Sequence, residues 1–170
     1  VDILKSANLA LDDKPHFFPK VFSDIKQLVS WESVNDCLNN PLFGLDLIDR
    51  NNRMVDIPKV IVPWVKIPVN DKTFVAEKIT EGWSFAIHNY GLHNKNIQLL
   101  LMELEQAFDI NCDVHAYGGL TNSTSFKIHD DFPPNIIIQI DGKTHWKVFN
   151  NRASPLYTIE HTHNFDIPES

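Results

Sequence analysis

Hydrophobic residues recur with helical spacing between residues 95 and 108. They are Ile97, Leu100, Leu101, Leu104 and Phe108. Intervals of three and four residues place these side chains on one face of an α-helix. Asn94, directly before the segment, is a residue type that favours the capping position. We therefore predict a helix over residues 95–108 that packs this stripe against the core.

A weaker amphipathic pattern covers residues 22–39. Ser23 and Asp24 are candidate caps for its start, because their side-chain oxygens can accept hydrogen bonds from exposed N–H groups. Ser30 is the candidate cap of a second helix in the same segment. The apolar side of that helix would consist of Trp31, Val34 and Leu38. The pattern therefore predicts a helical region in two pieces.

Residues 59–69, KVIVPWVKIPV, are rich in the β-branched residues that favour strands. Pro63 and Pro68 interrupt this run, and a proline cannot donate a ladder hydrogen bond. The segment therefore predicts an edge strand or an extended arm.

Short β-prone runs follow one another after residue 110, separated by Gly, Asn, Ser and Pro. They cover residues 112–117, 124–131, 135–141 and 144–149. This spacing is typical of an all-β sandwich or barrel, here preceded by a helical front end. We predict a mainly β fold with flanking α-helices in a single domain. Residues 1–110 would form a helical and edge-strand region that packs on a β core, residues 111–170.

Composition narrows the function classes. The chain has 170 residues, 43% of them hydrophobic, which is enough for one domain with a real core. Its net charge of −7 argues against a nucleic-acid partner, because phosphate binding needs clustered Lys and Arg. No apolar stretch approaches the ~20 residues that span a bilayer. We therefore expect no membrane partner. Cys37 and Cys112 form no CxxC pair, so we expect reduced thiols in a cytoplasmic protein.

Three ionisable residues, His129-Asp130-Asp131, stand directly before a run of isoleucines. On a strand, alternate side chains share a face, so His129 and Asp131 would point one way and Asp130 the other. An imidazole and a carboxylate so placed can be adjacent ligands of a divalent metal. One further histidine would complete the 2-His-1-carboxylate triad of non-haem iron oxygenases. The alternative is a surface histidine beside two solvated aspartates.

Residues 114–149, VHAYGGLTNSTSFKIHDDFPPNIIIQIDGKTHWKVF, resemble the core of the JmjC-type, cupin-like 2-oxoglutarate oxygenases. The branch that includes the ribosomal-protein hydroxylases is the most similar. The matching anchors are Tyr117, His129, Asp131, Gln139, Gly142 and Trp146. The upstream order of GWSFAI, a helix and FDINCDVHAY extends the similarity over residues 80–150.

This resemblance implies a double-stranded β-helix, or jelly roll, in which His129 and Asp131 bind Fe(II). The cofactors would be Fe(II) and 2-oxoglutarate. The reaction would be the hydroxylation of a C–H bond, and the expected substrate is a protein side chain. Tyr117 would contact the distal carboxylate of the cosubstrate, and Asn135 would donate a hydrogen bond to it. The alternatives are a strand aromatic for Tyr117 and a turn residue after two prolines for Asn135.

Three departures from the family pattern affect the site. The first is Thr144, which stands where the family has a basic residue for the cosubstrate carboxylate. A neutral hydroxyl cannot neutralise the charge of that carboxylate. Lys143 is one position early and should face the other way unless a bulge intervenes. The second departure is His115, which replaces a family asparagine. It would be either a substitute hydrogen-bond donor or a satisfied interior histidine.

The third departure is the distal histidine. His161 and His163 follow His129 by 32 and 34 residues, too few to pass through the intervening strands and return to the metal. We expect the third ligand beyond residue 170, so that the jelly roll is incomplete at the C-terminal end of this sequence.

Two other functions remain open. One is a catalytically silent cupin-like module that binds a small ligand or a partner protein, and the other is a small-molecule or amino-acid oxygenase. The partner would be a protein or small-molecule substrate, and the acidic composition favours a basic protein. The oligomeric state is left open, with a homodimer among the alternatives.

Overall fold

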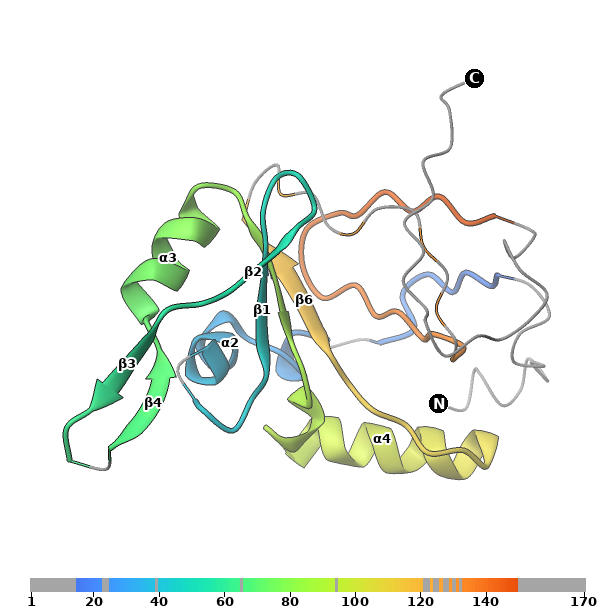
Figure 1. Ribbon diagram of the computed structural model, residues 1–170. Coiled ribbons are helices and arrows are strands. Elements are labelled where there is room, and N and C mark those ends of the chain that lie inside the picture. Colours follow the sequence, from blue (N-terminus) through green and yellow to red (C-terminus); the bar gives the residue numbers. More distant parts are fainter. Residues whose placement is uncertain are drawn as a thin grey trace, which may run out of the picture. The chain divides into compact units, whose positions relative to one another are not determined.

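The computed structural model describes most of the chain between residues 15 and 149 (Figure 1). The described residues are 15–22, 25–38, 40–64, 66–93, 95–120, 123, 126, 129, 131 and 133–149. Two compact units divide the chain: residues 27–126 form the first, and residues 2–26 with 127–170 the second. The elements from α2 to β6 all belong to the first unit.

The described elements alternate short helices with short strands. In order they are η1 (Ile25–Gln27), α2 (Trp31–Leu38), β1 (Leu45–Ile48), β2 (Met54–Val55), β3 (Lys59–Val62), β4 (Ile67–Asn70), α3 (Lys72–Thr80), β5 (Ser84–Ile87), η2 (Tyr90–Leu92), α4 (Lys95–Phe108) and β6 (Ala116–Gly119). None of the described helices is long and apolar enough to cross a bilayer.

A four-stranded antiparallel sheet in the order β2-β1-β5-β6 organises the first unit. Leu47 of β1 lies opposite Phe85 of β5, which in turn lies opposite Gly118 of β6. Opposed residues share a face of the sheet, so this row contributes to one apolar surface. A Cβ at Gly118 would lie 2.4 Å from Cζ of Phe85, so only glycine lets β6 pass over that ring.

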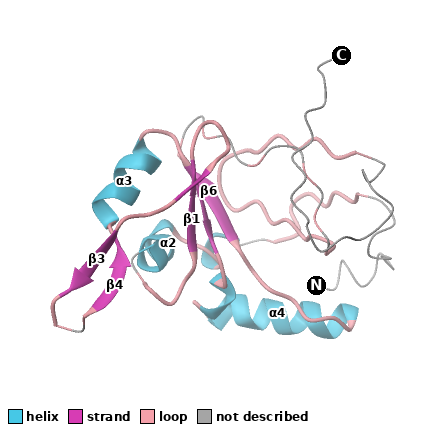
Figure 2. Cartoon of the chain, viewed as in Figure 1, coloured by secondary structure: helices cyan, strands magenta, loops and turns pink. Residues whose placement is uncertain are grey.

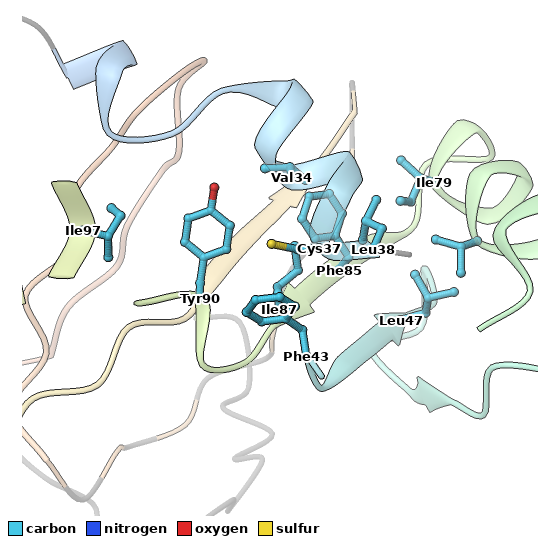
Figure 3. Packing of buried hydrophobic residues seen from close by; sticks show 11 residues of the cluster. Val34, Cys37, Leu38, Phe43, Leu47, Ile79, Phe85, Ile87, Tyr90 and Ile97 are labelled. Atoms are coloured by element: carbon cyan, nitrogen blue, oxygen red, sulfur yellow. The ribbon is translucent and has the colours of Figure 1, made fainter. Parts of the chain in front are cut away.

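The hydrophobic core lies between this apolar face and α2 (Figure 3). In Figure 3, Val34 and Cys37 of α2 lie near Phe85 and Ile87 of β5. The buried cluster comprises Val34, Cys37, Leu38, Phe43, Leu47, Val75, Ile79, Phe85, Ile87, Tyr90 and Ile97. These residues come from α2, β1, α3, β5, η2, α4 and the loop before β1. Most elements of the first unit therefore pack on one core.

Two of the three predicted helical pieces are α-helices, whereas the first piece of residues 22–39 contains, among its described residues, only the 3₁₀ turn η1. Helix α4 spans Lys95–Phe108, and its predicted stripe is buried or half-buried. Helix α2 starts after Ser30, whose Oγ accepts a hydrogen bond from the N–H of Ser33 at 3.1 Å. The N–H of Ser30 donates in return to Oγ of Ser33 at 3.1 Å, which is a reciprocal cap. The other predicted caps, Ser23, Asp24 and Asn94, lie outside the described residues.

The segment predicted as an edge strand or extended arm is a hairpin of two strands, β3 and β4. Pro63 lies in the turn, while Pro68 lies within β4 opposite Ile61. Each strand of a two-stranded sheet has an open edge, where the missing N–H of a proline costs no ladder hydrogen bond. The prolines therefore mark the turn and the open edge of one hairpin.

The late strands require a correction. Strand β6 begins at Ala116 and not at residue 112, and residues 133–149 are loop (Figure 2). The predicted strands 135–141 and 144–149 are therefore absent from this described segment, and most of 124–131 lies outside the described residues. A β-prone run is a strand only when a neighbour pairs with its backbone, and the described residues supply no such partner for 133–149.

The described fold is mixed: two antiparallel sheets and three α-helices, without a closed barrel among the described residues. Helices do accompany β-structure, as the sequence predicted, but the jelly roll stays a prediction. The division into residues 1–110 and 111–170 also stays a prediction.

Candidate functional site

Three of the predicted site residues lie together in the second unit. Nε2 of His129 is 3.6 Å from Oδ1 of Asp131, and Nδ2 of Asn135 donates a hydrogen bond of 2.6 Å to Oδ2 of the same carboxylate. The side chain of His129 is 28% exposed and that of Asp131 is 47% exposed. The carboxylate of Asp131 therefore lies between the imidazole and the amide, open to solvent on one side.

The local sequence explains how Asn135 reaches Asp131. Pro133 and Pro134 have a fixed φ, and each restricts the residue before it. A bend at Pro133 leads the chain to Asn135, four residues after Asp131 in the sequence. The two prolines thus limit the conformations in which the amide can meet the carboxylate.

This arrangement suits a divalent cation. Nε2 and Oδ1 are a nitrogen and an oxygen donor, the pair that iron, zinc and nickel accept in proteins. Their separation of 3.6 Å is longer than a good hydrogen bond. Asn135 occupies only the other oxygen, so it orients the carboxylate as outer partners of metal ligands do.

The remaining predicted residues lie on β6 and on the loop 133–149. Tyr117 lies on β6 in the first unit, 61% exposed, with its ring against Phe126 and His115. Thr144 lies on the loop 133–149 of the second unit and is exposed, as is Lys143. The structure therefore brings His129, Asp131 and Asn135 together, and the contacts of Tyr117, Asn135 and Thr144 with the cosubstrate stay predictions.

No third metal ligand is found in the part of the chain that the structure describes. Within it, no group of three or more His, Cys, Asp or Glu side chains could hold a metal ion. His161 and His163 lie outside the described residues. The expectation of a third ligand beyond residue 170 stays a prediction.

A second polar cluster, which the sequence did not reveal, lies on the first unit. Nε2 of His88 is 2.6 Å from Oδ2 of Asp46, and its Nδ1 is 2.9 Å from Nδ1 of His115. Nε2 of His115 is in turn 3.3 Å from Oδ2 of Asp113. His115 is thus neither isolated nor deeply buried, and it is the third member of a row of four ionisable groups.

The strand register builds this row. Asp46 lies opposite Ala86, which lies opposite Tyr117, on the sheet face away from the core. His88 and His115 continue that face beyond the ends of β5 and β6. The sequence shows only a single aspartate within the apolar run GLDLI and a histidine at the end of SFAIH, and the strand register is needed to join the two segments.

Comparison with protein-family models, with curated proteins and with solved structures finds no match to this chain. The resemblance to 2-oxoglutarate oxygenases therefore rests on the anchor residues of 114–149 themselves. Among them, His129 and Asp131 have side-chain atoms 3.6 Å apart.

Proposed function

We propose that this protein is an Fe(II)- and 2-oxoglutarate-dependent oxygenase that hydroxylates a protein side chain. The observation that carries the proposal is the 3.6 Å approach of His129 Nε2 to Asp131 Oδ1. These atoms belong to an H-x-D motif whose flanking anchors, from Tyr117 to Trp146, follow the order of that family. The proposed core is the jelly roll of such enzymes, in a cytoplasmic protein.

His129 and Asp131 would hold the metal through one nitrogen and one oxygen. Asn135 donates to the second carboxylate oxygen, so the orientation of Asp131 is set before a cation binds. The iron, with 2-oxoglutarate and O₂, supplies the oxidation of the C–H bond. The residues of the chain would hold the metal and orient the cosubstrate.

A threonine at position 144 should bind the cosubstrate carboxylate more weakly than the basic residue of the family would. A threonine hydroxyl donates one hydrogen bond, whereas an arginine donates two to a carboxylate and neutralises its charge. Tyr117 would supply a second hydrogen bond to the same distal carboxylate. On this basis Thr144→Arg should tighten 2-oxoglutarate binding, measured as the cosubstrate concentration at half saturation.

The test is an anaerobic titration of the purified protein with Fe(II) and then 2-oxoglutarate. We expect a weak visible charge-transfer band in the wild-type protein and its loss in His129→Ala. His145→Ala is the matched control, because this histidine is exposed on the loop 133–149 and lies outside the H-x-D motif. Succinate formation in air is the second readout. Absence of both the band and succinate contradicts the oxygenase.

A silent cupin-like module is the second candidate, and the neutral Thr144 favours it. Such a module would bind 2-oxoglutarate or a similar dicarboxylate without forming succinate. Calorimetry with 2-oxoglutarate, compared between wild type and His129→Ala, separates the two functions: the silent module binds equally well in both proteins. A third candidate, a small-molecule oxygenase, is distinguished by the product, since it would hydroxylate free amino acids but not peptides.

A further inference from the structure

The β3–β4 hairpin is a two-stranded sheet with apolar side chains exposed on both of its faces. Val60 and Ile61 point to opposite faces, because they are neighbours on a strand, and they are 44% and 68% exposed. Figure 1 shows the hairpin extending away from the four-stranded sheet. A two-stranded hairpin is marginally stable in water and gains stability from a third strand. A further strand at one of its edges would therefore stabilise it.

The ladder of the hairpin determines which backbone groups of β3 point outward. The N–H of Asp71 donates to the carbonyl oxygen of Pro58 at 2.8 Å, so residues 58 and 71 form a hydrogen-bonded pair. In an antiparallel ladder such pairs alternate with pairs whose N–H and C=O groups point away from each other. Counted from residues 58 and 71, the outward-pointing pairs are those that contain Lys59 and Ile61. The outer edge of β3 thus has two donors and two acceptors.

The outer edge of β4 has fewer donors than that of β3. Pro68 lies opposite Ile61, at an outward-facing position, and it has no N–H. Among the described residues, β3 pairs with β4 alone, so no described strand occupies the outer edge of β3. The edge of β3 is therefore the one that can form a full ladder with a further strand.

A second copy of β3 complements this edge. If two antiparallel copies meet across a two-fold axis at Val60, residue 59 of each lies opposite residue 61 of the other. The outward groups of both copies then face each other and form four hydrogen bonds. A register centred on Lys59 would place two lysines opposite each other. A register centred on Ile61 would place Pro63, which has no N–H, opposite Lys59. The register centred on Val60 avoids both conflicts.

Charge and apolar surface agree with the same register. Val60 shares a face with its partner Val69 in β4, and two copies would continue this aliphatic face across four strands. At each end, the turn of one copy would lie beside the residues that precede β3 in the other copy. This places Lys66 near Asp56, two exposed side chains of opposite charge. The chain is thus complementary to itself along β3.

We propose that β3 is a dimer interface, in which two copies of this chain pair antiparallel along their β3 edges with Val60 at the two-fold axis. The dimer would contain a four-stranded sheet in the order β4-β3-β3-β4. Its outer edges would be those with Pro68, which pair poorly, so the sheet would stop growing at two copies. The proposal uses residues of the first unit alone and does not rest on the oxygenase function.

The test is disulfide cross-linking of the full chain with Val60→Cys, in a Cys112→Ser background that removes the half-buried native thiol. The two copies of residue 60 would form a non-hydrogen-bonded pair with Cα atoms about 4.5 Å apart, where a disulfide can close. We expect a covalent dimer on non-reducing electrophoresis after treatment with oxidised glutathione. Ile67→Cys is the matched control, since Ile67 is 45% exposed on the same face of the hairpin. Its two copies would be at least about 14 Å apart across two strands, too far for a disulfide.

A second measurement needs no added cysteine. Ile61→Pro removes an outward N–H from each copy and no hydrogen bond within the hairpin. Sedimentation velocity should show a dimer dissociation constant raised about 30-fold, because two hydrogen bonds between the copies are lost. Ile61→Thr keeps the N–H and a branched side chain, so its dissociation constant should stay near that of wild type.

Three results would overturn the proposal. One is equal cross-linking of Val60→Cys and Ile67→Cys when both retain the circular dichroism spectrum of the parent. Another is an equal dissociation constant for Ile61→Pro and Ile61→Thr. The third is a wild-type chain that stays monomeric at all concentrations, which would leave the edge of β3 to a strand of a different protein.

Discussion

At the scale of single residues, Asp49 shows how one carboxylate organises a turn. It lies between β1 and β2, and its Oδ1 accepts hydrogen bonds from the N–H groups of Arg53 at 2.9 Å and Asn51 at 2.7 Å. Its own N–H donates to the carbonyl oxygen of Arg53 at 2.9 Å. The hydrogen bond from the Arg53 N–H, followed by that from Asn51, holds the pKa of Asp49 below its usual range.

This lowered pKa predicts a pH dependence of stability. The folded state favours the ionised carboxyl, so its contribution is present above the ordinary Asp pKa of about 4 and is lost as pH falls through the lower folded-state pKa. The free energy of unfolding of wild type should therefore exceed that of Asp49→Asn at pH 7, and the difference should vanish in acid. Urea titrations at pH 7, 4 and 3 measure it. Asp56→Asn controls for net charge, and a constant difference at all three pH values contradicts the prediction.

The two cysteines differ in burial, and this predicts an order of reaction. Cys37 is 1% exposed, and burial, with the charge of Asp36, raises the pKa of its thiol to about 11. Cys112 is half-buried, and burial followed by Glu105 raises the pKa of its thiol. Because the thiolate is the reactive form, both should react slowly, and Cys37 more slowly than Cys112.

Iodoacetamide labelling at pH 8, followed by peptide mass spectrometry, tests this order. Cys112 should be modified first in the folded protein, and both thiols should react at similar rates in urea. Labelling of Cys37 before Cys112 without urea would show that α2 opens more readily than its burial implies.

Residue-scale prediction from sequence succeeds where partners are close in the chain. His129 and Asp131 are two positions apart, so a local argument could place them together. Asp46 and His88 are 42 residues apart, and His88 and His115 are 27 apart. Only the pairing of β1, β5 and β6 joins them, and pairing depends on long-range contacts that no short pattern contains.

At the scale of elements, helix α3 depends on its first turn. Oδ1 of Asp71 accepts hydrogen bonds from the N–H groups of Thr73 at 2.9 Å and Phe74 at 3.3 Å. At the other end, Gly82 with φ of +92° ends the helix by donating to the carbonyl of Ile79 at 3.0 Å. Both ends are thus satisfied by the sequence that flanks the helix.

Loss of the N-terminal cap should therefore be measurable. Asp71→Ala leaves two backbone N–H groups without their acceptor and should lower the free energy of unfolding by about 1 kcal/mol. Asp71→Asn retains a side-chain oxygen and should cost less than the alanine variant. Urea unfolding followed by circular dichroism gives both values. Equal losses in the two variants would assign the effect to charge and not to capping.

The elements that could be predicted from the sequence have longer apolar patterns than those that could not. Helix α4 has five apolar positions over 14 residues, so its period is unambiguous. Helix α3 has 9 residues and only Val75 and Ile79 buried, too few to define a period. Strands β1 and β5 have 4 residues each, and an apolar run of that length fits a strand or a buried helical turn equally well.

At the scale of the whole molecule, the same limit applies to the predicted jelly roll. The runs after residue 110 have strand-like composition, but β-structure also requires a paired neighbour. Residues 116–119 have one in β5, while residues 133–149 have none in the described part of the chain. Ile137, Trp146 and Val148 are each more than half exposed on that loop. Composition could therefore predict where strands tend to form, but not which segments pair.

The β3–β4 hairpin predicts how whole molecules interact with one another. Ile61 is 68% exposed and Trp64 is 92% exposed, and among the described residues each of the two strands pairs only with the other. Exposed apolar edges pair with other chains. Lysine at Ile61 or Trp64 should therefore reduce self-association and change the free energy of unfolding by no more than about 0.5 kcal/mol, because neither side chain is buried.

Light scattering over a range of protein concentrations measures this effect. Leu42→Lys is the matched control, since it adds the same charge at an 80% exposed apolar position outside the hairpin. If Leu42→Lys reduces association as much as Ile61→Lys, the added charge is the cause and the hairpin edge is not. If only the hairpin variants do so, the open edges of β3 and β4 are where molecules of this protein meet.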